Sequence, residues 1–114
     1  MSTLSTHVLD TTRGLPAHGV PVVLERLDGP AGPSRLCESV TDADGRVRAL
    51  LPEGTALEEG MYRLTFDTWS YFAAVGSDGF YPEVSIVFQV RDAGRHHHVP
   101  LLLSPYGYST YRGS

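Results

Sequence analysis

Regular alternation of apolar and polar side chains is the feature of this sequence that most restricts its fold. Residues 84–90 alternate between two sets of side chains, which are Val84, Ile86, Phe88 and Val90 against Ser85, Val87 and Gln89. A period of two is typical of a β-strand with one buried face. Similar patterns predict strands over 4–10, 20–27 and 61–66, and less regular patterns predict strands over 35–41, 46–50 and 95–103.

Turn signals separate these segments. Asp42-Ala43-Asp44-Gly45 predicts a tight turn that holds Arg46 at the rim of a sheet, because Asp-Gly strongly favours chain reversal. Ser104-Pro105-Tyr106-Gly107 predicts a second reversal, after which a short polar segment runs back along the chain. Loops are predicted at 11–19, 28–33 and 77–82, where glycine, proline and polar residues gather.

One segment, around residues 68–75, fits a short helix. Asp67 or Thr68 can cap its first turn, and Gly76 can end it. Trp69, Phe72 and Ala73 fall at i, i+3 and i+4, which predicts the apolar face of the helix.

Together these patterns predict an all-β fold, an antiparallel β-sandwich of about eight strands with one short helix. The length of 114 residues fits a single domain over 1–114. Pro21 is expected at a sheet edge or at the first position of its strand, because proline has no N–H to donate.

Composition excludes several classes of function. The net charge is −4 with no basic run, which argues against nucleic-acid binding. All nine basic residues are arginine, so no lysine is present to form a Schiff base. Cys37 is the only cysteine, which excludes an intramolecular disulfide and a cysteine zinc cluster and suits a reducing compartment. With no secretory signal and no apolar run of membrane-spanning length, we expect a cytoplasmic protein without membrane contact.

Three consecutive histidines begin the strand predicted over 95–103. Because side chains alternate along a strand, His96 and His98 share one face while His97 shares the more apolar face expected in the core. The face of His98, Pro100 and Leu102 is too apolar to remain in water, so we expect it to pack on another subunit. The strand over 4–10 likewise turns His7 outward.

Each of these residues also has an ordinary interpretation. A strand histidine is commonly a polar surface residue, an arginine after Asp-Gly a solvated one, and Ser114 part of a frayed end. A metal site is a weak alternative, because only His96 and His98 could share an ion and no further ligand has suitable spacing. Periodicity alone therefore indicates a sandwich with a histidine-bearing association surface.

Four segments carry a more specific resemblance. They are Leu4-Ser5-Thr6-His7-Val8-Leu9-Asp10, Asp44-Gly45-Arg46, His98-Val99-Pro100-Leu101-Leu102-Leu103-Ser104-Pro105 and the terminal Tyr111-Arg112-Gly113-Ser114. In this order they resemble the transthyretin-related 5-hydroxyisourate hydrolases of urate breakdown, over essentially the whole chain. The resemblance implies a transthyretin-like fold and a homotetramer with active sites at the dimer–dimer interface.

The resemblance also implies an activity and its residues. The family opens 5-hydroxyisourate to 2-oxo-4-hydroxy-4-carboxy-5-ureidoimidazoline by attack of water on a lactam carbonyl, with no metal or cofactor. Its catalytic groups correspond to His7, Arg46 and His98, and its substrate-binding tail to Tyr111, Arg112, Gly113 and Ser114. Which histidine is the general base is left open. Transthyretin lacks the two histidines, the arginine and this ending, so the alternative, a non-catalytic carrier of an aromatic ligand, is the weaker expectation.

Overall fold

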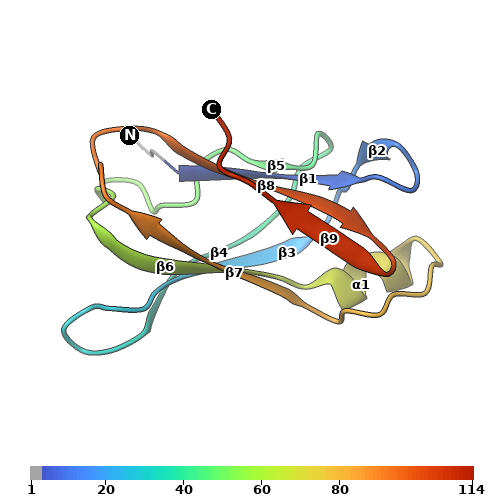
Figure 1. The fold of residues 1–114 in the computed structure, drawn as a ribbon, viewed down its shortest axis with the longest axis horizontal. Helices are drawn as coiled ribbons and strands as arrows, with labels where there is room; N and C mark the ends of the chain where they lie inside the picture. The colour runs from blue at the N-terminus through green and yellow to red at the C-terminus, as the bar shows by residue number, and fades with distance from the viewer. Residues whose placement is uncertain (1–3) are drawn as a thin grey trace.

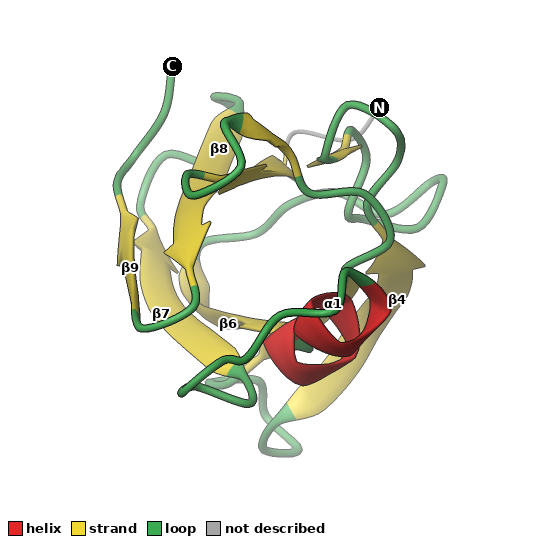
Figure 2. Cartoon of the chain, turned by 90° about the vertical axis from the view of Figure 1, so that its right-hand side faces the viewer, coloured by secondary structure: helices red, strands yellow, loops and turns green. Residues whose placement is uncertain are grey.

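Two β-sheets stacked face to face form the molecule in a computed structural model that describes residues 4–114 (Figure 1). The strands are β1 (Leu4–Asp10), β2 (Leu15–Pro16), β3 (Pro21–Arg26), β4 (Ser34–Val40), β5 (Arg46–Val47), β6 (Gly60–Phe66), β7 (Val84–Val90), β8 (His97–Ser104) and β9 (Gly107–Thr110). One helix, α1 (Thr68–Ala74), lies at one end of the sandwich (Figure 2). No helix within residues 4–114 is long and apolar enough to cross a membrane.

The first sheet contains the strands predicted to bear the site. Its order is β2-β1-β8-β9, and β5 pairs with β1 alongside β2. The second sheet has the order β4-β3-β6-β7, with every pair antiparallel. The all-β sandwich is thus confirmed, but β1 and β8 run parallel. This departure was not predictable from hairpin signals, because these strands are far apart in the chain and connect through the other sheet.

The predicted inward faces are confirmed by burial. In β1, Leu4, Thr6 and Val8 are buried, and β8 buries Val99, Leu101 and Leu103 against the second sheet. His97 faces the core as predicted and is 5% exposed, with a hydrogen bond joining Nδ1 to the Arg95 carbonyl at 2.9 Å. The core side of this sheet is therefore closed, and His98 belongs to the opposite face.

The helix is confirmed, but of its predicted apolar face only Phe72 is buried, and Trp69 and Ala73 are exposed. Asp67 caps α1 by accepting a hydrogen bond from the Ser70 N–H at 3.0 Å. The buried residues are Thr68, Tyr71 and Phe72, whereas Trp69 is 65% exposed. The Tyr71 hydroxyl donates to the buried Asp10 carboxylate at 2.7 Å, and this polar pair accompanies burial of a different face from the one predicted by apolar spacing.

Two further predictions are corrected in detail. β3 lies between β4 and β6, so Pro21 is not on an edge strand; it is the first residue of its strand, the other position considered. The strand predicted over 46–50 ends at Val47, and the short β2 occurs inside the predicted loop 11–19.

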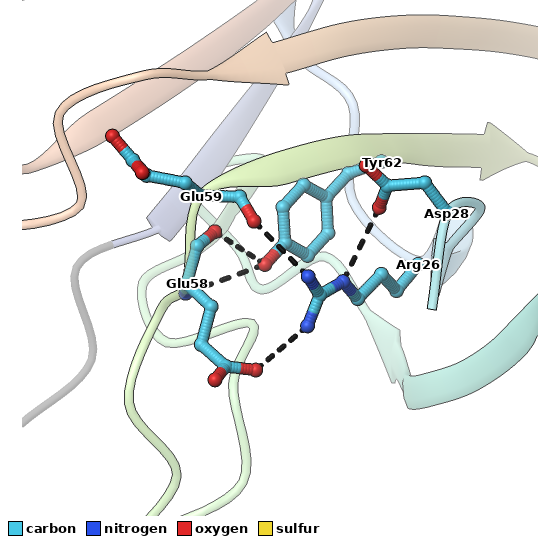
Figure 3. Close-up of polar contacts among 5 residues, drawn as sticks. All are labelled: Arg26, Asp28, Glu58, Glu59 and Tyr62. Carbon is cyan, nitrogen blue, oxygen red and sulfur yellow. Dashed lines mark hydrogen bonds and ion pairs between the residues drawn. The ribbon is translucent and has the colours of Figure 1, made fainter. Parts of the chain in front are cut away.

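A polar cluster fixes one end of the second sheet (Figure 3). Arg26 at the end of β3 donates to the Glu58 carboxylate at 2.7 Å, to the Glu59 carbonyl at 3.0 Å and to Asp28 at 3.3 Å. The Tyr62 hydroxyl donates to the Glu58 carbonyl at 2.6 Å. This network holds the segment before β6 against β3, on the sheet opposite the predicted site.

Candidate active site

Strand pairing places the predicted catalytic residues in two adjacent rows on the outer face of the first sheet. In the first row, His7 of β1 is directly paired with Arg46 of β5 on one side and with Pro100 of β8 on the other. In the second row, Ser5 is paired with His98. Directly paired residues project from the same face of a sheet, so His7, Arg46 and His98 share one surface.

The predicted Asp-Gly turn is present, and it holds Arg46 in the row with His7. The Gly45 N–H donates to the Asp42 carbonyl at 2.9 Å, and the Arg46 N–H donates to the Asp42 carboxylate at 3.0 Å. Gly45 adopts φ +74°, which glycine reaches without the steric cost of a side chain. The Val8 N–H then donates to the Gly45 carbonyl at 2.7 Å, anchoring the turn to β1.

A pocket of about 260 Å³ opens on this face beside His98. It is lined by Ser5, Thr6, Arg46, Arg48, His96, His98 and Ser114. Three predicted site residues, Arg46, His98 and Ser114, therefore meet in one cavity. Arg46 and Arg48 both line it, and the Arg48 guanidinium is ion-paired with Asp44 at 3.2 Å. The positive charge of Arg46 makes the pocket suited to an electron-rich substrate or to an oxygen that gains negative charge.

Sequence reasoning did not assign Ser5, Thr6, Arg48 or His96 to the site. The alternation along β1 and β8 already placed Ser5 and His96 on outward faces, and this signal could have found them. Hydrogen bonds join the Ser5 Oγ to His98 Nδ1 at 2.8 Å and to His96 Nε2 at 2.9 Å. The two imidazole rings lie 6.5 Å apart between centroids.

The end of the chain approaches His98. The Gly113 N–H donates to the His98 carbonyl at 2.8 Å, and Figure 1 shows the C-terminus above the outer side of the first sheet. A Cβ atom added to Gly113 would lie 2.5 Å from His98 Cδ2, so only glycine fits against this ring without movement. Ser114 continues into the pocket.

Tyr111 and Arg112 lie elsewhere. They line a neighbouring groove of about 290 Å³ between the tail and β7, which His98 also borders. The structure therefore divides the tail, with Ser114 in the pocket and Tyr111, 57% exposed, in the groove on the other side of Gly113.

Both outward histidines are shifted toward their neutral form. Burial, followed by the charge of Arg46, lowers the pKa of His7, while a hydrogen bond with the Asp44 backbone opposes the shift. Burial also lowers the pKa of His98, reinforced by Arg46, His7 and His96. Neutral imidazole carries a lone pair that can accept a proton at neutral pH.

The site offers few side chains that could bind a metal ion. Within residues 4–114, no group of three or more His, Cys, Asp or Glu side chains is placed to hold an ion. His96 and His98 are instead both engaged with the Ser5 hydroxyl.

Residues 4–113 match the HIUase/Transthyretin family. The chain belongs to this family. It is 50% identical over 111 residues to a Salmonella typhimurium protein named 5-hydroxyisourate hydrolase, covering 97% of this chain and 80% of the relative. The family membership predicted from four motifs is thus confirmed.

Solved structures of the HIUase/Transthyretin family have the same fold. The structure of Klebsiella pneumoniae 5-hydroxyisourate hydrolase superimposes with a TM-score of 0.84 at 42% identity, covering 99% of this chain and 100% of that chain. Transthyretin from Sparus aurata gives a TM-score of 0.89 at 31% identity, covering 99% of this chain and 97% of that chain. A protein named hydrolase and a protein named transthyretin therefore share this sandwich, so the fold does not distinguish their functions. The chemistry must be argued from the site.

Proposed function

We propose that this chain hydrolyses 5-hydroxyisourate to 2-oxo-4-hydroxy-4-carboxy-5-ureidoimidazoline, a step of urate degradation. The observation that carries the proposal is the meeting of a guanidinium and two histidines on one outward face, through the pairing of His7 with Arg46 and of Ser5 with His98. The hydrolase names of relatives at 50% and 42% identity support the substrate.

Hydrolysis of a lactam requires two proton transfers and the stabilisation of a negative charge. Water must lose a proton as its oxygen bonds to the carbonyl carbon, the carbonyl oxygen must hold negative charge, and the leaving nitrogen must gain a proton as the C–N bond breaks. His7 and His98 are assigned to these proton transfers, because burial lowers the pKa of each and favours a neutral imidazole that can accept a proton. The histidine that takes the proton from water becomes an imidazolium, and this proton passes, directly or through the other histidine, to the leaving nitrogen. No metal ion or cofactor is needed for these steps.

Arg46 supplies the charge. Its backbone is held by the Asp42 turn, and the residue lines the pocket beside His98. A planar guanidinium donates paired, charge-assisted hydrogen bonds to oxygen, which suits both a substrate carbonyl and the oxyanion formed from it. We therefore assign Arg46 to substrate anchoring and oxyanion stabilisation.

The tail is proposed to complete the substrate site. Ser114 lines the pocket and offers a hydroxyl group, and Gly113 lets the chain pass close to His98. Tyr111 and Arg112 line the neighbouring groove, and we propose that they bind the substrate from there.

We also propose a homotetramer whose active sites lie at the dimer–dimer interface. Leu9 and Leu102 lie on the outer face and are only half-buried within one chain, and covering them with another subunit would remove apolar surface from water. Light scattering of the purified protein should give four times the mass of one chain; a monomer that is fully active would contradict this assignment.

The function is tested by ultraviolet decay of freshly generated 5-hydroxyisourate. Because this compound also hydrolyses spontaneously, the protein must accelerate the decay above that baseline. His98→Ala should remove most of the acceleration while retaining the wild-type circular dichroism spectrum. If the wild-type protein binds the compound without accelerating its decay, the chain is a carrier, as the transthyretin fold also permits.

A further inference from the structure

Ser5 is one of the pocket residues to which the proposed chemistry has given no role. It lies on β1, is 8% exposed, and has its hydroxyl between two imidazoles. Its Oγ lies 2.8 Å from His98 Nδ1 and 2.9 Å from His96 Nε2. The parallel pairing of β1 with β8 makes this possible, because residues 96 and 98 lie two apart and project to the same side as Ser5.

The ring of His98 is held on two edges. Ser5 bonds its Nδ1 edge, and Gly113 packs against the opposite Cδ2 edge so closely that a Cβ atom would not fit. In an imidazole the remaining atoms, Cε1 and Nε2, form the tip farthest from the backbone. The hydrogen bonds that the structure gives this ring within residues 4–114 come from Ser5, through its hydroxyl at Nδ1 and through its backbone. The frame therefore leaves Nε2 as the nitrogen available to a reacting molecule.

The hydrogen count at Ser5 then limits the state of His98. A serine hydroxyl has one hydrogen, so it can donate to one neutral imidazole and must accept from the other. If it accepts from His98 Nδ1, the Nε2 of His98 carries a lone pair; if it donates to His98 Nδ1, Nε2 carries a hydrogen. Arg46 lines the pocket and its charge acts on the His98 ring, and a cation favours a lone pair over an N–H bond turned toward it.

We propose that Ser5 is a positioning residue that accepts a hydrogen bond from His98 Nδ1–H and donates one to His96 Nε2, so that His98 presents its Nε2 lone pair to the attacking water. This inference rests on the proposed hydrolase function and makes His98 the general base. When Nε2 takes the proton from water, the contact from Nδ1–H to Ser5 becomes charge-assisted and stabilises the imidazolium. His96 acts only through Ser5, by keeping the serine lone pairs directed at His98.

Kinetics of three serine variants test the proposal. Ser5→Ala should lower kcat by about 10- to 100-fold with KM within about twofold, because the lost hydrogen bond is one to a charged group. Ser5→Thr retains the hydroxyl on a strand position and should recover most of kcat. The matched control Ser85→Ala, an exposed serine of β7 on the other sheet, should remain at wild-type rates. Wild-type kcat in Ser5→Ala, or no recovery in folded Ser5→Thr, would overturn the proposal.

A spectroscopic measurement separates this proposal from the proposed function. Nitrogen-15 chemical shifts of the imidazoles, recorded near pH 8 in the absence of substrate, distinguish a protonated from an unprotonated ring nitrogen. Wild-type His98 should show hydrogen on Nδ1, and both Ser5→Ala and His96→Ala should increase the form with hydrogen on Nε2. Hydrogen on Nε2 in the wild type would overturn the assignment. A protein that fails to hydrolyse 5-hydroxyisourate but shows hydrogen on Nδ1 would refute the proposed function and leave the hydrogen-bond arrangement of Ser5 and His98 supported.

Discussion

His7 and Arg46 are direct partners in the antiparallel pair of β1 and β5, and the charge of Arg46 contributes to the lowered pKa of His7. Such partners carry Cβ atoms about 5 Å apart on one face. The strand β5 has only two residues, so this pairing depends on the Asp42–Gly45 turn that precedes it. A short turn and a short strand thereby place a permanent cation beside a neutral imidazole.

Arg46 is expected to require its guanidinium geometry and not only its charge. Arg46→Lys should lower kcat/KM by about 10- to 100-fold and Arg46→Ala by about 10²–10³-fold, because lysine lacks the planar fork that pairs with carbonyl oxygens. Steady-state rates with fresh substrate provide the measurement. Arg35→Lys, on β4 of the other sheet, is the matched control and should change nothing. Equal rates for Arg46→Lys and wild type would remove the bidentate role.

Each outward histidine is expected to carry part of the proton transfer. His98→Ala and His7→Ala should each lower kcat by about 10²–10⁴-fold, the usual contribution of a general acid or base. His18→Ala, in an exposed loop, should retain full activity. Thermal unfolding of all three variants separates loss of chemistry from loss of fold. Near-normal turnover of either His7→Ala or His98→Ala would exclude that histidine from the mechanism.

Activity should increase with pH, and the midpoint of this increase should lie below the ordinary pKa of histidine. The pKa of both His7 and His98 is lowered from 6.5, and the proposed base works only when it is deprotonated. The acid limb of kcat/KM should therefore have its midpoint below 6.5. Arg46→Ala should move the pKa of His7 upward in an NMR titration. A midpoint above 6.5 would contradict the assignment.

The lowered pKa values of His7 and His98 also predict how the free energy of unfolding changes with pH. Unfolded histidines titrate near 6.5 and bind more protons than the folded chain between that pH and the lowered folded values. The free energy of unfolding should rise with pH across this window and fall as pH drops through it. Urea unfolding at several pH values measures the slope, and the double variant of His7 and His98 to alanine should flatten it.

Gly113 is expected to be needed for its lack of a side chain. In Gly113→Ala the added methyl group meets the His98 ring, so the imidazole must turn away from its frame. We expect kcat to fall by at least about 10-fold, since small misplacements of a reacting group are costly, while the unfolding midpoint changes little. Gly107→Ala is the control, because its Cβ would meet only the Ser104 hydroxyl at 3.8 Å. Full activity of Gly113→Ala would show that the ring tolerates movement.

Replacing Gly45 with alanine should lower the free energy of unfolding more than replacing Gly14. A Cβ atom at Gly45 would collide with the Val8 carbonyl, and the residue adopts φ +74°. Gly14 has a similar φ of +67° but open space around the added carbon. Gly14→Ala should therefore cost only the backbone term of about 1–2 kcal/mol, and Gly45→Ala clearly more, measured by urea unfolding. Equal costs would mean that the turn relaxes around the methyl group.

Local patterns in the sequence were sufficient for most strands and for the turn before Arg46. Alternation predicted the buried faces of β1, β7 and β8, because a strand turns successive side chains to opposite sides whatever it pairs with. The helix was also predicted, but of its buried face only Phe72 was, since the burial of Tyr71 accompanies a hydrogen bond to Asp10 that apolar spacing does not reveal. The motifs further identified the family and the residues proposed for catalysis.

Contacts between distant segments were decided only by the tertiary structure. Parallel pairing of β1 with β8 brings Ser5 to His98 across 93 positions, and the folding back of the chain end sets Gly113 against the same ring. Alternation states which way a side chain points and not which strand lies beside it, because register depends on packing of the whole sandwich. The sequence alone thus determined that His7 and His98 face outward and that a turn holds Arg46 at the rim of a sheet, whereas the pairing of β1 with β5 decided that Arg46 lies beside His7. Only the fold decided that Ser5, His96 and Gly113 surround His98, and that Tyr111 and Arg112 border a different groove.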